Sequence, residues 1–179
     1  MTKIVLTFGL IAGAILATIM LATMPLYKSG IITFENGHLV GYSSMVIAFS
    51  MVFFGVKSYR DNQLGGSITF GKALQVGLLI SLVATVMYAI GWEFYYNVYA
   101  PDFMDEYAAF VVNKAKSRGT SEAELQQLIA EMEDAKQYYK VPLIRIGMTL
   151  TEPLPVGILF SLVTAGLFRN KKFLATQIA

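Results

Sequence analysis

The chain has 179 residues, of which 55% are hydrophobic, against roughly 45–50% in soluble globular proteins. Its 14 Lys and Arg nearly balance its 12 Asp and Glu, and the mean hydropathy is +0.56. Without a basic stripe, a nucleic-acid-binding protein is disfavoured, and we expect no nucleic-acid partner. The absence of cysteine excludes a disulfide framework, a thiolate metal site and a catalytic thiol.

Four segments are long and apolar enough to cross a hydrocarbon core about 30 Å thick, which takes about 20 residues of helix. We place these spans at about residues 4–26, 39–56, 70–96 and 143–168. The first is longer than the apolar core of a signal peptide, about 7–15 residues, so we expect a retained anchor. The predicted fold class is all-α: residues 1–179 form one membrane domain, an integral membrane four-helix bundle, with the lipid bilayer as its surroundings.

Cations near the span ends predict the orientation, because cytoplasmic loops collect Lys and Arg. One side gathers seven of them: Lys3, Lys57, Arg60, Lys72, Arg169, Lys171 and Lys172. We therefore expect a multi-pass protein of a bacterial inner membrane with both termini in the cytoplasm. Aromatic residues then fall at the outer interface, where rings with one polar end are stable: Tyr27, Tyr42, Trp92, Tyr95, Tyr96, Tyr99, Tyr138 and Tyr139.

The connections between spans differ in length. Residues 60–66, with their two glycines, predict a tight cytoplasmic turn. Residues 101–140 predict an extracytoplasmic hairpin of two amphipathic helices between the third and fourth spans. The first helix opens after Asp102 and closes at Gly119, while Ser121 and Glu124 form a capping-box pattern for the second.

The apolar faces of this hairpin require a partner: the other helix, the membrane surface, a second copy or another protein. Residues 97–141 contain eight acidic and five basic residues, a balance that disfavours anionic lipid. We expect the hairpin to pack on itself and over the bundle. A surface for another protein, or for self-association, is the alternative.

Small residues recur every fourth position in three spans, as in helices that approach closely in lipid. They are Gly9, Gly13 and Ala17; Gly77, Ser81, Thr85 and Ala89; and Gly157, Ser161 and Ala165. This pattern predicts close packing, and it also offers faces for self-association.

Glu152 is the main candidate for a polar site inside the membrane. It lies about ten residues from the outer end of its span, or roughly 15 Å deep. A carboxylate at that depth is costly unless it is protonated, paired or facing a water-filled cavity. It could couple the transport of protons or cations, or it could belong to a structural kink.

Several residues are expected near Glu152. Pro153 and Pro155 free the carbonyls of Thr149 and Thr151, which could coordinate a cation or be satisfied by the threonine hydroxyls. An antiparallel third span places Thr85 and Tyr88 at the same depth.

Glu93 and Arg145 lie about three residues inside the outer ends of the third and fourth spans. They predict an interfacial ion pair that fixes the register of the two helices. The mouth of a conduction path is the less favoured interpretation.

No enzymatic motif is present in the sequence. His38 is the one histidine, so neither a His-based zinc motif nor an imidazole acting with a second histidine can form. Phosphate loops, nucleophile elbows and dinucleotide fingerprints are also absent. We expect no catalytic residues, no metal, no cofactor and no enzymatic activity.

The order of short motifs along the chain resembles a known family. They are Arg60-Asp61, the run from Gly65 to Ala73, Trp92, Pro101-Asp102-Phe103, the turn from Gly119 to Leu125, the run from Glu152 to Gly157, and Ser161-Leu162-Val163. Together they resemble the domain-of-unknown-function 4199 family, small four-span membrane proteins of Bacteroidetes and related bacteria. The resemblance implies an architecture and carries no functional residues.

Three functions remain open from the sequence. The favoured one is a non-enzymatic structural or interaction component of the membrane. The second is a small proton- or ion-coupled carrier that uses Glu152, and the third is an intramembrane enzyme. A water-accessible pocket that reaches Glu152 would favour the carrier.

Overall fold

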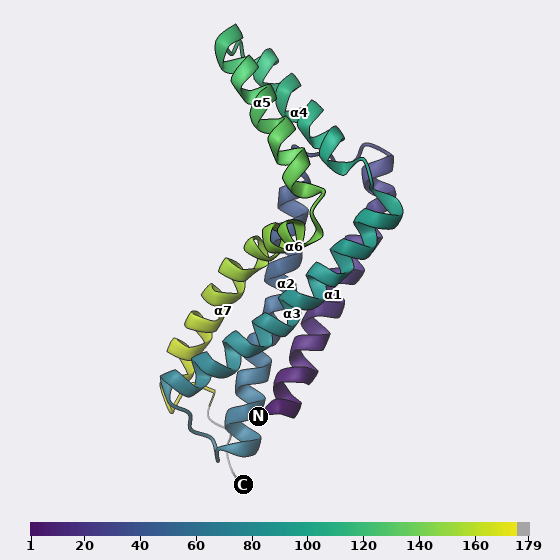
Figure 1. Cartoon of the computed structure of the whole chain (residues 1–179). Helices are drawn as coiled ribbons and strands as arrows, with labels where there is room; N and C mark the ends of the chain where they lie inside the picture. The colour runs from purple at the N-terminus through teal and green to yellow at the C-terminus, as the bar shows by residue number, and fades with distance from the viewer. Residues whose placement is uncertain (175–179) are drawn as a thin grey trace.

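The computed structural model describes residues 1–174, apart from the side chain of Lys28. All regular structure in this part of the chain is helical, which confirms the all-α class. The helices are α1 (Thr2–Lys28), α2 (Gly37–Gln63), α3 (Phe70–Tyr99), α4 (Phe103–Ser117), α5 (Glu122–Tyr139), α6 (Pro142–Thr151) and α7 (Pro153–Phe168). Figure 1 shows their arrangement.

Four stretches of helix are long and apolar enough to cross a membrane: Thr2–Tyr27, Gly37–Gln63, Phe70–Tyr99 and Pro142–Phe168. They confirm the four predicted apolar segments and indicate a membrane protein. The first three helices extend past the predicted ends, because helical geometry continues into the residues that follow the apolar run, whereas the fourth begins one residue earlier, at Pro142, and ends at Phe168 as predicted.

The turn predicted at residues 60–66 begins too early, since α2 continues to Gln63. Lys57 and Asp61 stabilise this last turn of the helix with an i,i+4 ion pair of 2.7 Å. The chain reverses only at Gly65 and Gly66, whose φ angles of 64° and 89° favour glycine.

Helix α3 packs against α1, α2 and α7, and small residues make two of these contacts close. Gly9 and Gly13 of α1 lie against Val83 and Met87 of α3. On another face of α3, a Cβ added at Gly157 would lie 2.8 Å from the Cβ of Ser81. The predicted packing role of the small residues is therefore met within one chain.

The end of α2 gathers both ends of the described chain. Arg60 is fully buried and donates hydrogen bonds of 2.7 Å to the carbonyls of Phe173 and Leu174. The amino group of Met1 donates to Gln63 at 2.7 Å. Met1 and residues 173–174 thus lie at the same end of the molecule, away from the α4–α5 hairpin (Figure 1).

The α4–α5 hairpin has the predicted local signals. Ser121 and Glu124 make both hydrogen bonds of a capping box, and Gly119 turns the chain with a φ of 76°. The two helices pack on each other, burying Ala108 and Leu125.

The hairpin packs on itself as expected, and it contacts the other helices through the first turns of α4 and the end of α5. Figure 1 shows that it projects away from α1–α3, and α5 continues into a contact with α6. The apolar stripes are covered mainly between α4 and α5, with Phe34 of the α1–α2 connection against Phe103 and Phe110 of α4. Lys136 adds an ion pair of 2.9 Å with Asp105 across the hairpin.

We predict that Gly157→Val destabilises the protein by about 1–3 kcal/mol, because the added side chain overlaps Ser81 in a close helix contact. Gly166→Val in the same helix is the matched control, since nothing lies within 4 Å of an added Cβ there. Unfolding in mixed detergent micelles measures both variants. Equal losses would contradict the assigned contact.

We predict that acidification weakens the hairpin through Asp105. The hydrogen bond from Lys136 lowers the pKa of the Asp105 carboxyl below its ordinary value. A lowered pKa stabilises the fold above the unfolded pKa, about 3.9, and that contribution is lost as the pH falls through the lower folded value. The thermal midpoint should therefore fall less between pH 7 and pH 3 in Asp105→Asn than in the wild type. Asp134→Asn in the same hairpin should behave as the wild type.

Candidate functional site

The fourth apolar segment is interrupted at Glu152. Helix α6 ends at Thr151 and α7 begins at Pro153, so Glu152 ends one helix and precedes the next. Proline lacks a backbone N–H, and Pro153 and Pro155 cannot continue the hydrogen-bond ladder of α6. The carboxylate thus lies, in the middle of an apolar segment, where two prolines remove backbone N–H donors, while Glu152 itself keeps helical φ and ψ angles of −79° and −55°.

Glu152 lies at one end of a cavity of about 580 Å³ that is lined by residues of α1, α2, α3 and the start of α4. This volume is within the usual range of small-molecule sites, about 300–1,000 Å³. The cavity thus joins the helix interruption to the base of the hairpin.

One part of the cavity lining surrounds the carboxylate of Glu152, an exposed residue. The hydroxyl of Tyr88 faces Oε2 of Glu152 at 3.4 Å, a long hydrogen bond. Helix α2 approaches through Gly41, where an added Cβ would lie 3.7 Å from Oε1 of Glu152. Ser44, one turn further along, also lines the cavity, and its hydroxyl donates to the carbonyl of Gly41 at 2.6 Å.

The part of the lining nearest the hairpin, which we call the aromatic mouth, contains Phe34, Trp92, Tyr95, Phe103 and Tyr107. Trp92 lies against Phe103 and Tyr95, with ring centroids 4.9 and 5.3 Å apart. Phe34 contacts Phe103 and Tyr107 at 5.7 and 5.6 Å. The indole N–H of Trp92 donates to the hydroxyl of Tyr139 at 2.7 Å, which fixes the orientation of this wall.

Glu93 and Arg145 lie outside this cavity, and the structure brings them together. The guanidinium donates to both carboxylate oxygens of Glu93 at 2.7 and 2.6 Å. It also donates to the carbonyl of Tyr139 at 3.0 Å and lies 4.2 Å from the ring centre of Tyr96. Arg145 of α6 thereby links this helix to α3.

Of the other predicted site residues, only Tyr88 reaches Glu152. The hydroxyls of Thr149 and Thr151 donate to the carbonyls of Arg145 and Met148 in their own helix, at 2.9 and 2.6 Å. Thr85 is fully buried, and its hydroxyl has no hydrogen-bond partner among the described residues. The threonines therefore do not form a shared polar cluster with the carboxylate.

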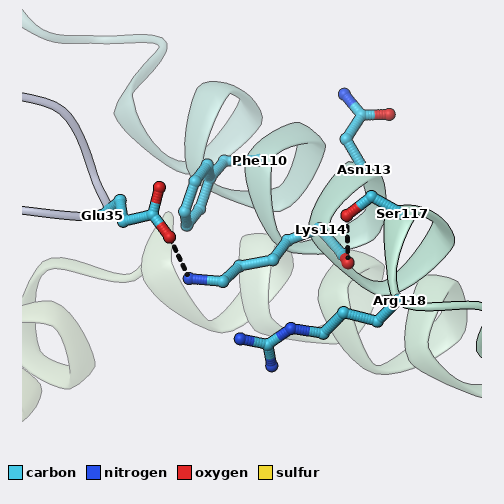
Figure 2. A pocket seen from close by; sticks show the side chains of 6 residues that line it. All are labelled: Glu35, Phe110, Asn113, Lys114, Ser117 and Arg118. Atoms are coloured by element: carbon cyan, nitrogen blue, oxygen red, sulfur yellow. Dashed lines mark hydrogen bonds and ion pairs between the residues drawn. The ribbon is translucent and has the colours of Figure 1, made fainter.

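A second hollow, of about 400 Å³, lies where α4 meets the α1–α2 connection. Figure 2 shows the amine of Lys114 facing the carboxylate of Glu35, at 3.1 Å. The amine also lies 5.3 Å from the ring centre of Phe110. The ion pair joins the hairpin to the α1–α2 connection, and Asn113, Ser117 and Arg118 complete the polar lining of this hollow.

A metal centre has no support in the part of the chain that the structure describes. No three His, Asp or Glu side chains of residues 1–174 lie close enough to hold a metal ion. The lone histidine, His38, lines the cavity beside aromatic and apolar residues.

Sequence reasoning missed most of the cavity. Gly41 and Ser44 carry no motif, and Glu106 belongs to an acidic helix surface. Tyr27, Trp92 and Tyr95 were assigned to the membrane interface. The sequence signal that could have indicated the cavity was the clustering of aromatic residues at the outer ends of the predicted spans.

Comparison with known proteins identifies the family. The family described as "Protein of unknown function (DUF4199)" matches residues 7–170. The chain belongs to this family, which confirms the resemblance of its motifs. No curated protein and no solved structure matches the chain.

We predict that Arg145→Met costs up to about 3 kcal/mol of stability, the lower end for a broken buried pair. The loss stays there because the Glu93 side chain is 22% exposed, against 4% for Arg145. Exchanging the charges, as Glu93→Arg with Arg145→Glu, should restore part of the stability. Restoration stays partial because a carboxylate at position 145 cannot donate to Tyr139. Unfolding in mixed micelles measures the set, and no recovery on exchange would reject the pairing.

Proposed function

We propose that this DUF4199 member is a non-enzymatic protein of the bacterial inner membrane that binds a small ligand beside Glu152 and acts as a carrier for it. The observation that supports this function is the cavity of about 580 Å³ that reaches Glu152 at the interruption between α6 and α7. A membrane-embedded acid beside a broken helix is how many carriers form their sites.

The cavity changes the order of the functions considered from sequence. If the kink had a purely structural role, the side chain of Glu152 would be expected in a dry, close-packed contact. Glu152 instead lines a space large enough for a ligand, and its nearest polar partner, Tyr88, makes only a long contact of 3.4 Å. These features favour binding over a structural role.

An enzymatic function has less support. Ser44 is a hydroxyl that lines the cavity, and it donates to the carbonyl of Gly41 rather than to a base. His38 shares the lining, but activation of a nucleophile requires the two groups to be in hydrogen-bond contact. We therefore retain the proposal of a protein without catalytic residues or cofactors.

The orientation belongs to the same proposal. Met1 and residues 173–174 meet at the end of α2 that carries Lys57 and Arg60. Cations collect on cytoplasmic loops, so this end is assigned to the cytoplasm in a four-span bundle. The hairpin and the mouth of the cavity are then extracytoplasmic.

A second function, docking of another protein or a second copy, has one observation in its favour. The α4–α5 hairpin projects from the remaining helices (Figure 1) and its outer surface is free in the described chain. The small-residue faces offer less support for self-association, since α1, α3 and α7 use Gly13, Gly77 and Gly157 for contacts within the chain.

We predict that the cavity admits water-soluble reagents. The chain has no cysteine, so single cysteines can be placed without removing others. Ser44→Cys lines the cavity, whereas Ser81→Cys lies in the close contact between α3 and α7. In proteoliposomes, a membrane-impermeant methanethiosulfonate should modify Ser44→Cys at least about tenfold faster than Ser81→Cys. Equal rates would reject an accessible cavity, and with it the proposed function.

A further inference from the structure

We propose that the cavity binds the ammonium group of an organic cation, primary or quaternary, between Glu152 and its aromatic wall. This inference rests on the proposed function and specifies its ligand. It follows from the charges that line the cavity, from the rings around its mouth and from the alternatives that these residues disfavour.

The charged groups of the lining are acidic. Glu152 lies between α6 and α7 and Glu106 in the first turn of α4, and Lys and Arg are missing from the described lining residues. Neither carboxylate has an ion-pair partner among the side chains that the structure describes. Arg145, the cation of the neighbouring helix, is already paired with Glu93. In its ionised form, Glu152 therefore requires a cation that the described chain does not supply.

The walls between the two acids suit a cation of low hydration. Rings of Phe34, Tyr88, Trp92, Tyr95, Phe103 and Tyr107 line the cavity. Aromatic faces attract organic ammonium groups through the ring quadrupole, and clusters of such rings are a recurrent way to bind quaternary ammonium. The orientation of Trp92 is fixed in advance by its hydrogen bond to Tyr139, which reduces the ordering cost of binding.

An anion is disfavoured at this site. Two unpaired carboxylates would repel it, and the N-terminus of α7, the positive helix end beside Glu152, begins with Pro153 and contains Pro155. These prolines remove two of the N–H groups with which a helix N-terminus binds anions. The first residues of α2 and α4, Gly37 and Phe103, also line the cavity, but their N–H groups donate to the carbonyls of Thr33 and Ala100.

A bare metal ion and a purely apolar molecule are also disfavoured. Calcium needs about six to eight oxygen ligands, whereas the surroundings of Glu152 offer its own carboxylate and the hydroxyl of Tyr88. An apolar molecule would leave Glu152 with only the long contact from Tyr88, which is costly for a carboxylate at membrane depth. An organic ammonium satisfies both the acid and the rings.

The ammonium group could be carried by a soluble amine or by a phospholipid headgroup such as ethanolamine. The chemistry recognised at Glu152 is the same in both cases. The two sources differ in how the group reaches the cavity, and the experiment separates them.

Trp92 provides the readout, because it is the single tryptophan of the chain and lines the cavity. The full-length protein in detergent is titrated with choline and with its neutral carbon isostere, dimethylbutanol, at constant ionic strength. Choline should change the Trp92 emission saturably, and dimethylbutanol should act at least about tenfold more weakly, a difference of about 1.4 kcal/mol. Equal responses to the two compounds, or no response to either in detergent or in the bilayers below, would overturn the proposal.

Two variants assign the charge. Glu152→Gln keeps the shape of the side chain and should weaken choline binding at least about tenfold, while Glu106→Gln at the exposed mouth should weaken it less. Glu133→Gln on the exposed surface of α5 is the matched control and should bind as the wild type. If Glu152→Gln does not fold, protection of Ser44→Cys from modification by choline, and not by dimethylbutanol, tests the same point. Unaltered binding in a folded Glu152→Gln would contradict the assignment.

The source is separated in lipid bilayers. Nanodiscs of phosphatidylglycerol alone are compared with nanodiscs that also contain phosphatidylethanolamine. If the headgroup is the ligand, phosphatidylethanolamine should itself change the Trp92 emission and weaken the response to choline. If a soluble amine is the ligand, the choline response should be the same in both bilayers. Both results support an ammonium site and differ in its source.

Failure of this inference is distinguishable from failure of the proposed function. If Ser44→Cys is as unreactive as Ser81→Cys, the cavity is closed and both fail. If Ser44→Cys reacts but choline and dimethylbutanol act alike, the cavity binds ligands without preference for ammonium and only this inference fails.

Discussion

In a hydrocarbon environment every backbone polar group must find its hydrogen bond inside the protein, and this constraint accounts for most of the structure. Four apolar stretches meet it by being helical. The interruption at Glu152 departs from it, because Pro153 and Pro155 break the ladder between α6 and α7. Irregular backbone at membrane depth is tolerated where it is covered by protein or lines a cavity. The cavity beside Glu152 is therefore consistent with the break, and the two features support one another.

Away from the cavity the helices pack closely. The contact of Ser81 with Gly157 leaves no room for a side chain between α3 and α7, and the buried hydroxyl of Ser161 bonds to the carbonyl of Gly157 at 2.7 Å. Near Glu152 the side chains of α3 that line the cavity are aromatic: Tyr88, Trp92 and Tyr95. Along α3, small residues such as Ser81 are followed by Tyr88 and Trp92. This change marks the boundary between the close-packed part of the molecule and the cavity.

Sequence predicted what depends on local pattern and missed what depends on assembly. The spans follow from runs of apolar residues, and the helix start at Ser121 follows from its spacing to Glu124, so both could be predicted. The cavity is built from residues as far apart as Leu16 and Glu152, and no periodicity links them. Tyr27 and Trp92 were assigned to the interface because each was considered alone. How far the hairpin covers the other helices could not be predicted, because the sequence pattern shows an apolar helix face without showing which surface it contacts.

The hairpin and the apolar helices are not independent parts. Phe103, Glu106 and Tyr107 of α4 line the cavity, so the first turns of the hairpin form part of its wall. Tyr139, the last residue of α5, accepts the indole N–H of Trp92 through its hydroxyl and a guanidinium N–H of Arg145 through its carbonyl. The Glu93–Arg145 ion pair stabilises the same junction of α3, α5 and α6. The ion pair that was predicted to fix the helix register thus also stabilises Tyr139, which in turn orients Trp92. The shape of the aromatic mouth therefore depends on a contact outside the cavity.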